Sequence, residues 1–199
     1  MKKNLPATAA LLFGMLTTAA HALDLTPHEI TITEEGPPVQ RFYFQDESRQ
    51  LSFKIDNQMM ASGSSTSVSF RFRDLSTAGM KLSKSPLPAS LPFEEKNAET
   101  YRTSARTFIP KEAAAVQLEN EAPDALAING WTSRQFTFTY TLFGVPYRST
   151  VTFVNFNAQE QFVFDVSGAV ADQGKAYARS YRVLNSLGEL KKASSTGPS

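Results

Sequence analysis

Residues 132–156 read TSRQFTFTYTLFGVPYRSTVTFVNF, and this stretch decides the fold. From Thr132 to Leu142 the chain alternates strictly, which is typical of a half-buried strand. The inward set is Phe136, Phe138, Tyr140 and Leu142. Gly144-Val145-Pro146 supplies a turn, and Tyr147–Phe156 returns as a second strand. The stretch therefore predicts a hairpin with one aromatic face.

The segment that follows extends this hairpin. Gln161–Ser167 is predicted as a third strand after the turn Asn157-Ala158-Gln159. Turns this short cannot hold a parallel crossover, so the three strands form an antiparallel meander. Asp172 is then predicted to cap a helix that runs to about Leu187. We expect its stripe to lie on the aromatic face of the meander. The stripe consists of Tyr177, Tyr181, Leu184 and Leu187.

The amino-terminal half has weaker patterns. Alternation predicts strands over residues 28–33, 41–44, 51–55 and 66–73. Segments that are rich in small polar residues or contain proline predict loops over residues 61–67 and 74–90. Residues 111–118 are expected to form a short helix, followed by a loop over residues 119–127. For residues 92–107 the apolar spacing favours a helix, whereas the Thr and Ser content leaves a strand open. The fold class is α+β, with an antiparallel sheet packed against helices.

The amino terminus has the pattern of an export signal. Lys2 and Lys3 precede the apolar run Ala7–Ala20, and Ala20-His21-Ala22 is an A-x-A site for cleavage before Leu23. Residues 1–22 are thus predicted as a signal peptide, residues 23–190 as a single domain and residues 191–199 as a disordered tail. We expect a periplasmic protein without a transmembrane anchor after cleavage, with secretion beyond the outer membrane left open.

Composition excludes several classes of site. The chain has no cysteine, which excludes disulfides, thiolate metal sites and a cysteine nucleophile. Residues 23–199 hold 18 basic and 19 acidic side chains, so no nucleic-acid partner is expected. His28 is the one histidine left after cleavage, and it is interpreted as an ordinary strand-end side chain. No catalytic motif is present, so we predict a protein that is not an enzyme, with no cofactor and no metal.

The segment Ala127–Leu190 resembles a known family in several places. The matching features are Asn129-Gly130-Trp131, the strand around Phe136, the hairpin through Gly144, Phe162-Val-Phe164 and the helix start at Asp172. On these residues, about a third of the chain is similar to the carboxy-terminal half of the PsbP/DcrB-like family of exported α+β domains. The resemblance implies an antiparallel sheet with packed helices and an accessory role without an activity. Many bacterial members look like lipoproteins, and a tether of that kind does not carry over because the cysteine is missing.

A candidate surface for a partner follows from exposed cations and aromatics. Arg71 and Arg73 share one strand face, and we expect Arg134 and Arg148 to approach each other across the central hairpin. Trp131 and Tyr147 lie near strand ends, where aromatic side chains often contact partners. The first hypothesis is an exported, non-catalytic periplasmic accessory protein that binds another envelope protein. Its surface would be the sheet face that no helix covers, or the loop over residues 74–90.

Two alternatives stay open at this stage. The numerous aromatics permit a carrier of a small apolar ligand, held in a cavity between the sheet and the carboxy-terminal helix. A carboxylate-based hydrolase needs two acidic side chains across a cleft, and the candidate carboxylates are Glu119, Glu121, Asp124 and Asp165. The first three are also the residues that could offer oxygen ligands to calcium, although a solvated loop explains them equally.

Overall fold

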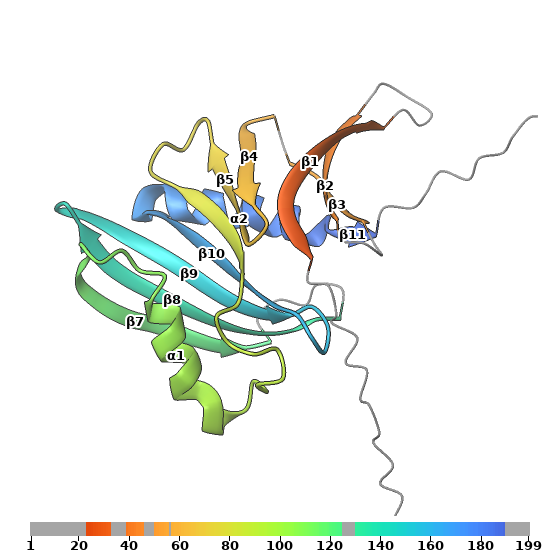
Figure 1. The fold of residues 1–199 in the computed structure, drawn as a ribbon. Helices are drawn as coiled ribbons and strands as arrows, with labels where there is room; N and C mark the ends of the chain where they lie inside the picture. The colour runs from red at the N-terminus through yellow and green to blue at the C-terminus, as the bar shows by residue number, and fades with distance from the viewer. Residues whose placement is uncertain (1–22, 33–38, 46–49, 56, 125–129, 190–199) are drawn as a thin grey trace, which may run out of the picture.

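The computed structural model describes residues 23–32, 39–45, 50–55, 57–124 and 130–189. In this part of the chain a seven-stranded antiparallel sheet has the order β4-β5-β6-β10-β9-β8-β7, and a four-stranded sheet has the order β1-β2-β3-β11 (Figure 1). The strands are β1 (Asp24–Ile32), β2 (Val39–Gln45), β3 (Gln50–Phe53), β4 (Met59–Ser64), β5 (Ser67–Phe72), β6 (Gly79–Lys84), β7 (Ala114–Pro123), β8 (Thr132–Leu142), β9 (Val145–Asn155), β10 (Gln161–Ala169) and β11 (Gly188–Glu189). The helices are the 3-10 turn η1 (Glu95–Asn97), α1 (Ala98–Arg106) and α2 (Val170–Asn185).

The predicted meander is confirmed. β8, β9 and β10 pair antiparallel in sequence order, and β8 has the bounds that alternation predicted. The terminal helix is also present, although it begins at Val170, so Asp172 lies in its first turn instead of capping it. There the carboxylate of Asp172 accepts a hydrogen bond from the Thr77 hydroxyl at 2.7 Å. The α+β class predicted from the sequence is therefore the class of the structure.

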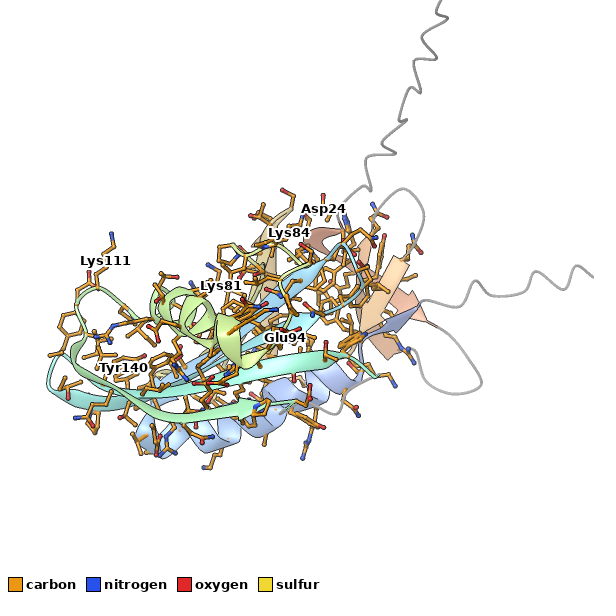
Figure 2. All side chains as sticks on the ribbon, turned by 90° about the horizontal axis from the view of Figure 1, so that it is seen from below. Asp24, Lys81, Lys84, Glu94, Lys111 and Tyr140 are labelled. Atoms are coloured by element: carbon orange, nitrogen blue, oxygen red, sulfur yellow. The ribbon has the colours of Figure 1, made fainter. Side chains whose placement is uncertain are left out.

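The large sheet is covered on opposite faces by the two helices. Figure 2 shows α1 on one side of the sheet and α2 on the other. The side of Phe136 is called the α1 face below, and the side of its neighbour Gln135 is called the α2 face. On the α1 face a core forms under α1 from Tyr101, Ala105, Ile109, Phe136, Phe138, Tyr140, Val151, Phe153 and Val163. The aromatic face of the hairpin is thus covered by α1, and the expectation that the terminal helix covers it was wrong.

A second core lies on the α2 face and joins the two sheets. It includes Phe44 and Phe53 of the four-stranded sheet, Phe70 of β5, and Leu184 of α2. Of the predicted helix stripe, Leu184 and Leu187 are buried, Tyr177 is half-buried and Tyr181 is exposed. The stripe is rotated because Ala176, Ser180 and Val183 also face the sheet.

Strand β10 lies between both cores. Phe162 and Phe164 belong to the core on the α2 face, whereas Val163 belongs to the core under α1. Burial on both faces explains why this strand has consecutive apolar residues instead of an alternating pattern. β10 therefore anchors the meander between the two cores.

Three predictions in the amino-terminal half and centre of the chain were wrong. Residues 61–67 were expected to be a loop, yet β4 occupies most of them, and Gly63 allows a backbone approach that a Cβ atom would block at 2.5 Å from the Ser67 carbonyl oxygen. Residues 74–90 contain β6, whose Met80 and Leu82 point into the core. Residues 111–118 were expected to be helical, but β7 begins within them and runs through the expected loop to Pro123. The helix in the segment 92–107 is present as η1 and α1.

The remaining predictions fall on other parts of the chain. The signal peptide and the polar tail lie outside the described residues. No helix in the described ranges is both long enough and apolar enough to span a bilayer.

Candidate functional site

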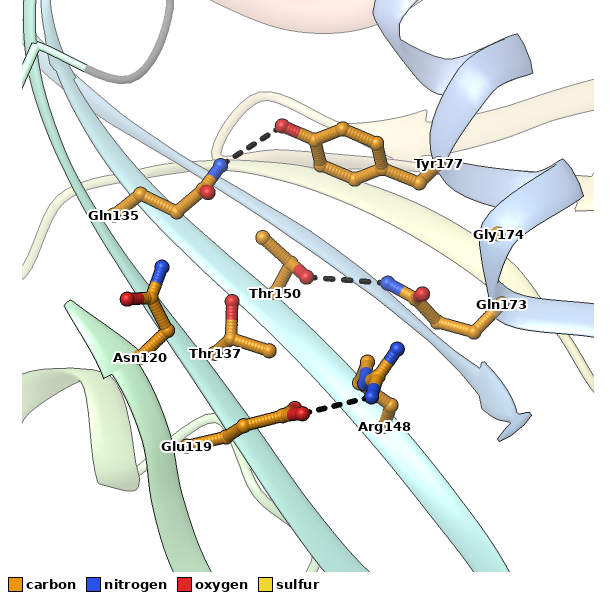
Figure 3. Close-up of a pocket in the computed structure, with 9 residues that line it drawn as sticks. All are labelled: Glu119, Asn120, Gln135, Thr137, Arg148, Thr150, Gln173, Gly174 and Tyr177. Atoms are coloured by element: carbon orange, nitrogen blue, oxygen red, sulfur yellow. Dashed lines mark hydrogen bonds and ion pairs between the residues drawn. The ribbon is translucent and has the colours of Figure 1, made fainter. Parts of the chain in front are cut away.

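A polar groove opens on the α2 face of the large sheet, between α2 and the strands β7, β8 and β9 (Figure 3). Its volume is about 350 Å³. Side-chain amides, hydroxyls and one ion pair line it, which is unusual for a face that packs a helix. The groove exists because β8 and β9 present Gln and Thr on this face, and apolar residues on the other.

A β-bulge at the sheet edge directs two side chains of β7 into this groove. The register of β7 on β8 shifts between Leu118 and Asn120, so Glu119 is an extra residue in the strand. Glu119 and Asn120 are neighbours in sequence, yet both line the groove. Bulges at sheet edges commonly redirect side chains next to functional sites. The bulge also explains why β7 has no alternating sequence pattern.

Hydrogen bonds fix the wall that α2 contributes. The Gln135 amide donates to the Tyr177 hydroxyl at 2.9 Å and to the Thr152 hydroxyl at 3.1 Å. Gln173, which is 5% exposed, donates through Nε2 to the Thr150 hydroxyl at 3.1 Å. Each amide retains a carbonyl oxygen with acceptor capacity. The groove therefore holds donors and acceptors in a fixed geometry before any ligand arrives.

One ion pair crosses the outer end of the groove. Arg148 donates from Nη2 to Glu119 Oε1 at 2.8 Å, and both side chains remain partly exposed. The Nε atom of Arg148 is buried and has no hydrogen-bond partner among the described residues. An exposed ion pair contributes about 0–1 kcal/mol to stability, so a bound group can replace either partner at little cost. A Cβ atom placed on Gly174 would lie more than 4 Å from the neighbouring described side chains, so this end of the groove is open.

Of the six residues predicted as a partner surface, Arg148 alone lines this groove. Arg134 is 4% exposed and lies on the α1 face, where its guanidinium binds Glu121. Arg134 pairs across the sheet with Phe153, five residues from Arg148, so the two arginines point to opposite faces. They do not approach each other, and Arg134 belongs to the interior.

The other four predicted residues lie elsewhere. Arg71 and Arg73 are exposed at the end of β5. Trp131 is half-buried against Phe156, with ring centroids 5.0 Å apart. Tyr147 is half-buried and stacks on Tyr140 at 5.8 Å on the α1 face. The six residues therefore do not form one continuous surface.

The candidate carboxylates do not converge in a cleft. Burial alone would raise the pKa of Glu121, but hydrogen bonds from Arg102 and Arg134 more than offset it and leave the pKa lowered. Asp124 accepts a hydrogen bond from the Ser133 amide at 3.3 Å at the end of β7, and Glu119 lines the groove. Burial raises the pKa of Asp165 to about 6, against hydrogen bonding from Ser149. No pair among these four stands across a cleft from the other in the described residues.

Among the described residues, neither an apolar cavity between α2 and the sheet nor a metal cluster is seen. The space between α2 and the sheet near Phe164 and Leu184 has a volume of about 10 Å³, enough for at most one water molecule. His28 stacks on Tyr43 at 5.2 Å in β1 and β2. Within the described ranges, no group of three acidic or histidine side chains is placed to hold a metal ion.

Comparison with solved structures shows which known fold this architecture is similar to. No protein-family model and no curated protein matches the chain. The solution structure of cyanobacterial PsbP from Synechocystis matches with a TM-score of 0.50 and 14% identity, over 74% of this chain and 91% of that one. The chain has a PsbP-like fold. The resemblance inferred from residues 127–190 is therefore confirmed at the level of the fold.

Two further solved structures match the chain with lower TM-scores. LpqN of Mycobacterium tuberculosis, described as involved in cell envelope biogenesis, matches with a TM-score of 0.47 and 10% identity, over 82% of this chain and 91% of that one. The Ran-binding protein Mog1p of Saccharomyces cerevisiae also gives 0.47, at 6% identity, over 82% of this chain and 96% of that one.

Sequence reasoning missed most of the groove. Gln135 and Thr137 were expected to face outward, and Thr150 and Gln173 were not singled out. The available signal was the Gln and Thr content of the regular strand β8, on the face opposite its aromatic residues. That signal cannot show that a helix comes to lie over one end of this polar face.

Proposed function

We propose that this protein is an exported, non-catalytic accessory protein that binds a polypeptide segment of another envelope protein in the polar groove. The observation that carries the proposal is the convergence of fixed side-chain amides and hydroxyls around an exposed ion pair. The sequence pattern of residues 1–22 supports export, and the PsbP-like fold is consistent with an accessory role.

A polypeptide fits this lining better than an apolar ligand does. Peptide groups carry one donor and one acceptor each, and the amides of Asn120, Gln135 and Gln173 offer the complementary pair. A charged side chain of the partner can replace one member of the Arg148–Glu119 pair. Small-molecule pockets are mostly apolar, whereas eight of the nine residues that line this open groove carry a polar side chain.

The test uses site-specific photo-crosslinking in cells that express the full chain. A photoreactive phenylalanine replaces Asn120, at the rim of the groove, and a control carries it at Thr103, on the exposed side of α1. We expect one discrete crosslinked species from position 120 and none from position 103. Adding Gln173→Leu to the position-120 variant should abolish the adduct because it removes the amide that orients the groove wall.

Two results would contradict the proposal. Equal crosslinking from both positions would show contact without use of the groove. An adduct that survives both Gln173→Leu and Arg148→Gln would show that the polar lining does not recognise the partner. Export is tested separately by sequencing the amino terminus of the envelope form, which should begin at Leu23.

A further inference from the structure

A second hollow lies on the α1 face of the large sheet, at strands that α1 does not cover. Its volume is about 480 Å³. Lys81 of β6 is in direct register with Ser69 of β5 and with Asp165 of β10, so the three side chains share this face. One rung further along, Arg71 and Ser167 flank Gly79. Figure 2 shows Lys81 on the same side of the sheet as α1.

Two cations, Arg71 and Lys81, face this hollow. Arg71 and Lys81 are both exposed, and neither forms an ion pair with a described residue. Gly79 lies between Arg71 and Ser167 and has no side chain, which leaves the floor of the hollow open. Arg71 and Lys81 are diagonal neighbours on adjacent strands, where long side chains come within reach of each other and like charges repel. The hollow is therefore a place where a bound anion would relieve repulsion.

Asp165 is the carboxyl group that lines the same hollow. Its Oδ1 accepts a hydrogen bond from the Ser149 hydroxyl of β9 at 2.6 Å. The other charged or titratable groups that face it are Lys81 from β6 and Tyr140 from β8, with Tyr147 of β9 stacked on Tyr140. Burial raises the pKa of Asp165 to about 6 and that of Tyr140 to about 12. Asp165 thus changes charge just below neutral pH, whereas Tyr140 stays neutral there.

We propose that this hollow binds a small oxyanion, such as phosphate, sulfate or a phosphate monoester, between Arg71 and Lys81. The hydroxyls of Ser69 and Ser167 line the same hollow and can donate hydrogen bonds to the anion. Asp165 is the one carboxylate among the described residues that line the hollow, so its protonation removes a negative charge there and binding strengthens as the pH falls through about 6. The hollow and the polar groove lie on opposite faces of the sheet, so this site does not depend on the function proposed for the groove.

Inorganic sulfate is the first probe because its charge does not change between pH 5 and 8, roughly the range over which Asp165 titrates. Amide chemical shifts of residues 23–190 are followed by NMR at constant ionic strength. We expect saturable shifts at Gly79, Lys81 and Ser167. The dissociation constant should be roughly tenfold smaller at low than at neutral pH, because a unit charge close to a dianion is removed.

Four variants separate this site from non-specific attraction. Arg71→Gln and Lys81→Gln should each weaken sulfate binding roughly tenfold, by loss of a charge-assisted hydrogen bond. Arg106→Gln removes an equal charge from the exposed end of α1 and should leave binding unchanged. Asp165→Asn should bind at neutral pH as the unaltered protein does at low pH. The NMR spectrum shows whether each variant is folded, and the pH series on the unaltered protein carries the test if Asp165→Asn is not.

Inorganic phosphate and glycerol phosphate, compared at one pH, distinguish the two sources of this chemistry. Tighter binding of inorganic phosphate indicates a free anion, and tighter binding of the monoester indicates an esterified phosphate group. The proposal is overturned if the shifts map away from Gly79 and Lys81. It is also overturned if Arg71→Gln binds sulfate as well as Arg106→Gln does, or if affinity does not change with pH.

Discussion

Replacing Arg134 by methionine tests how the α1 face is held together. Its guanidinium donates to Glu121 from Nε at 2.7 Å and from Nη2, and contacts the carbonyl oxygens of Phe93 and Glu94 at 3.3 and 3.4 Å. These contacts join β8 to β7 and to the segment before α1. Arg134→Met leaves Glu121, whose side chain is 14% exposed, with Arg102 as its remaining partner.

The expected loss is about 3 kcal/mol of unfolding free energy, the lower end of the range for breaking a buried ion pair. The lower end applies because Arg102 still donates to Glu121 at 2.6 Å. The double variant Arg134→Met/Glu121→Met should be more stable than the single variant by about 1–2 kcal/mol, since no buried carboxylate is left without its partner. Urea unfolding of residues 23–190 at neutral pH measures both values.

The pH dependence provides a second measure of the same interaction. The pKa of Glu121 is lower in the folded than in the unfolded chain, where it is near 4.5. Its contribution is therefore present above that value and is lost as the pH falls through the folded pKa. In the double variant this acid-dependent part of the stability should disappear. The reasoning is refuted if the single variant loses less than about 1 kcal/mol, or if the double variant is the less stable of the two.

Substitutions at three further positions have expected outcomes that the same urea unfolding measures. Phe143 is 86% exposed at a φ of +50°, so Phe143→Asn should stabilise the turn by about 0.5–1 kcal/mol while Phe143→Ala changes little. Tyr101→Phe should cost about 1–2 kcal/mol, because the hydroxyl donates to the Leu91 carbonyl at 2.7 Å in a buried site. For Asp165 the pKa is raised from 3.8 to about 6, so the folded chain loses stability as the pH rises through that window. Asp165→Asn should therefore stabilise the folded chain by about 1–2 kcal/mol near pH 8 and should not stabilise it near pH 4. This free energy is smaller than the full pKa shift implies, because the side chain is partly exposed to solvent.

The part of the fold predicted best is the part where each strand has one polar face and one apolar face. β8 was predicted with its observed bounds because Phe136 and Phe138 alternate with Gln135 and Thr137. β4 was missed because its small side chains carry no contrast between the faces. β6 was missed although Met80 and Leu82 alternate with Lys81, because neighbouring prolines indicated a loop.

The candidate sites were less predictable than the fold, for a geometric reason. Arg148 and Arg71 were selected as exposed cations, and each lines a separate hollow. Arg134 was selected by the same reasoning and is buried, because its partner Glu121 comes from a segment that was predicted as a loop. The face that each helix covers depends on chain crossings that residue periodicity does not encode.

The central strand of the seven-stranded sheet, β10, has one consequence for how binding could be transmitted. β10 is packed on both sides, so a slip by one residue would expose Val163 and Phe164 and their neighbours to the wrong surroundings at once. Such a strand resists sliding against either of the strands that pair with it. β10 lines the hollow through Asp165 and Ser167 and pairs with β9, which lines the polar groove, so adjacent strands of one sheet carry the two binding sites.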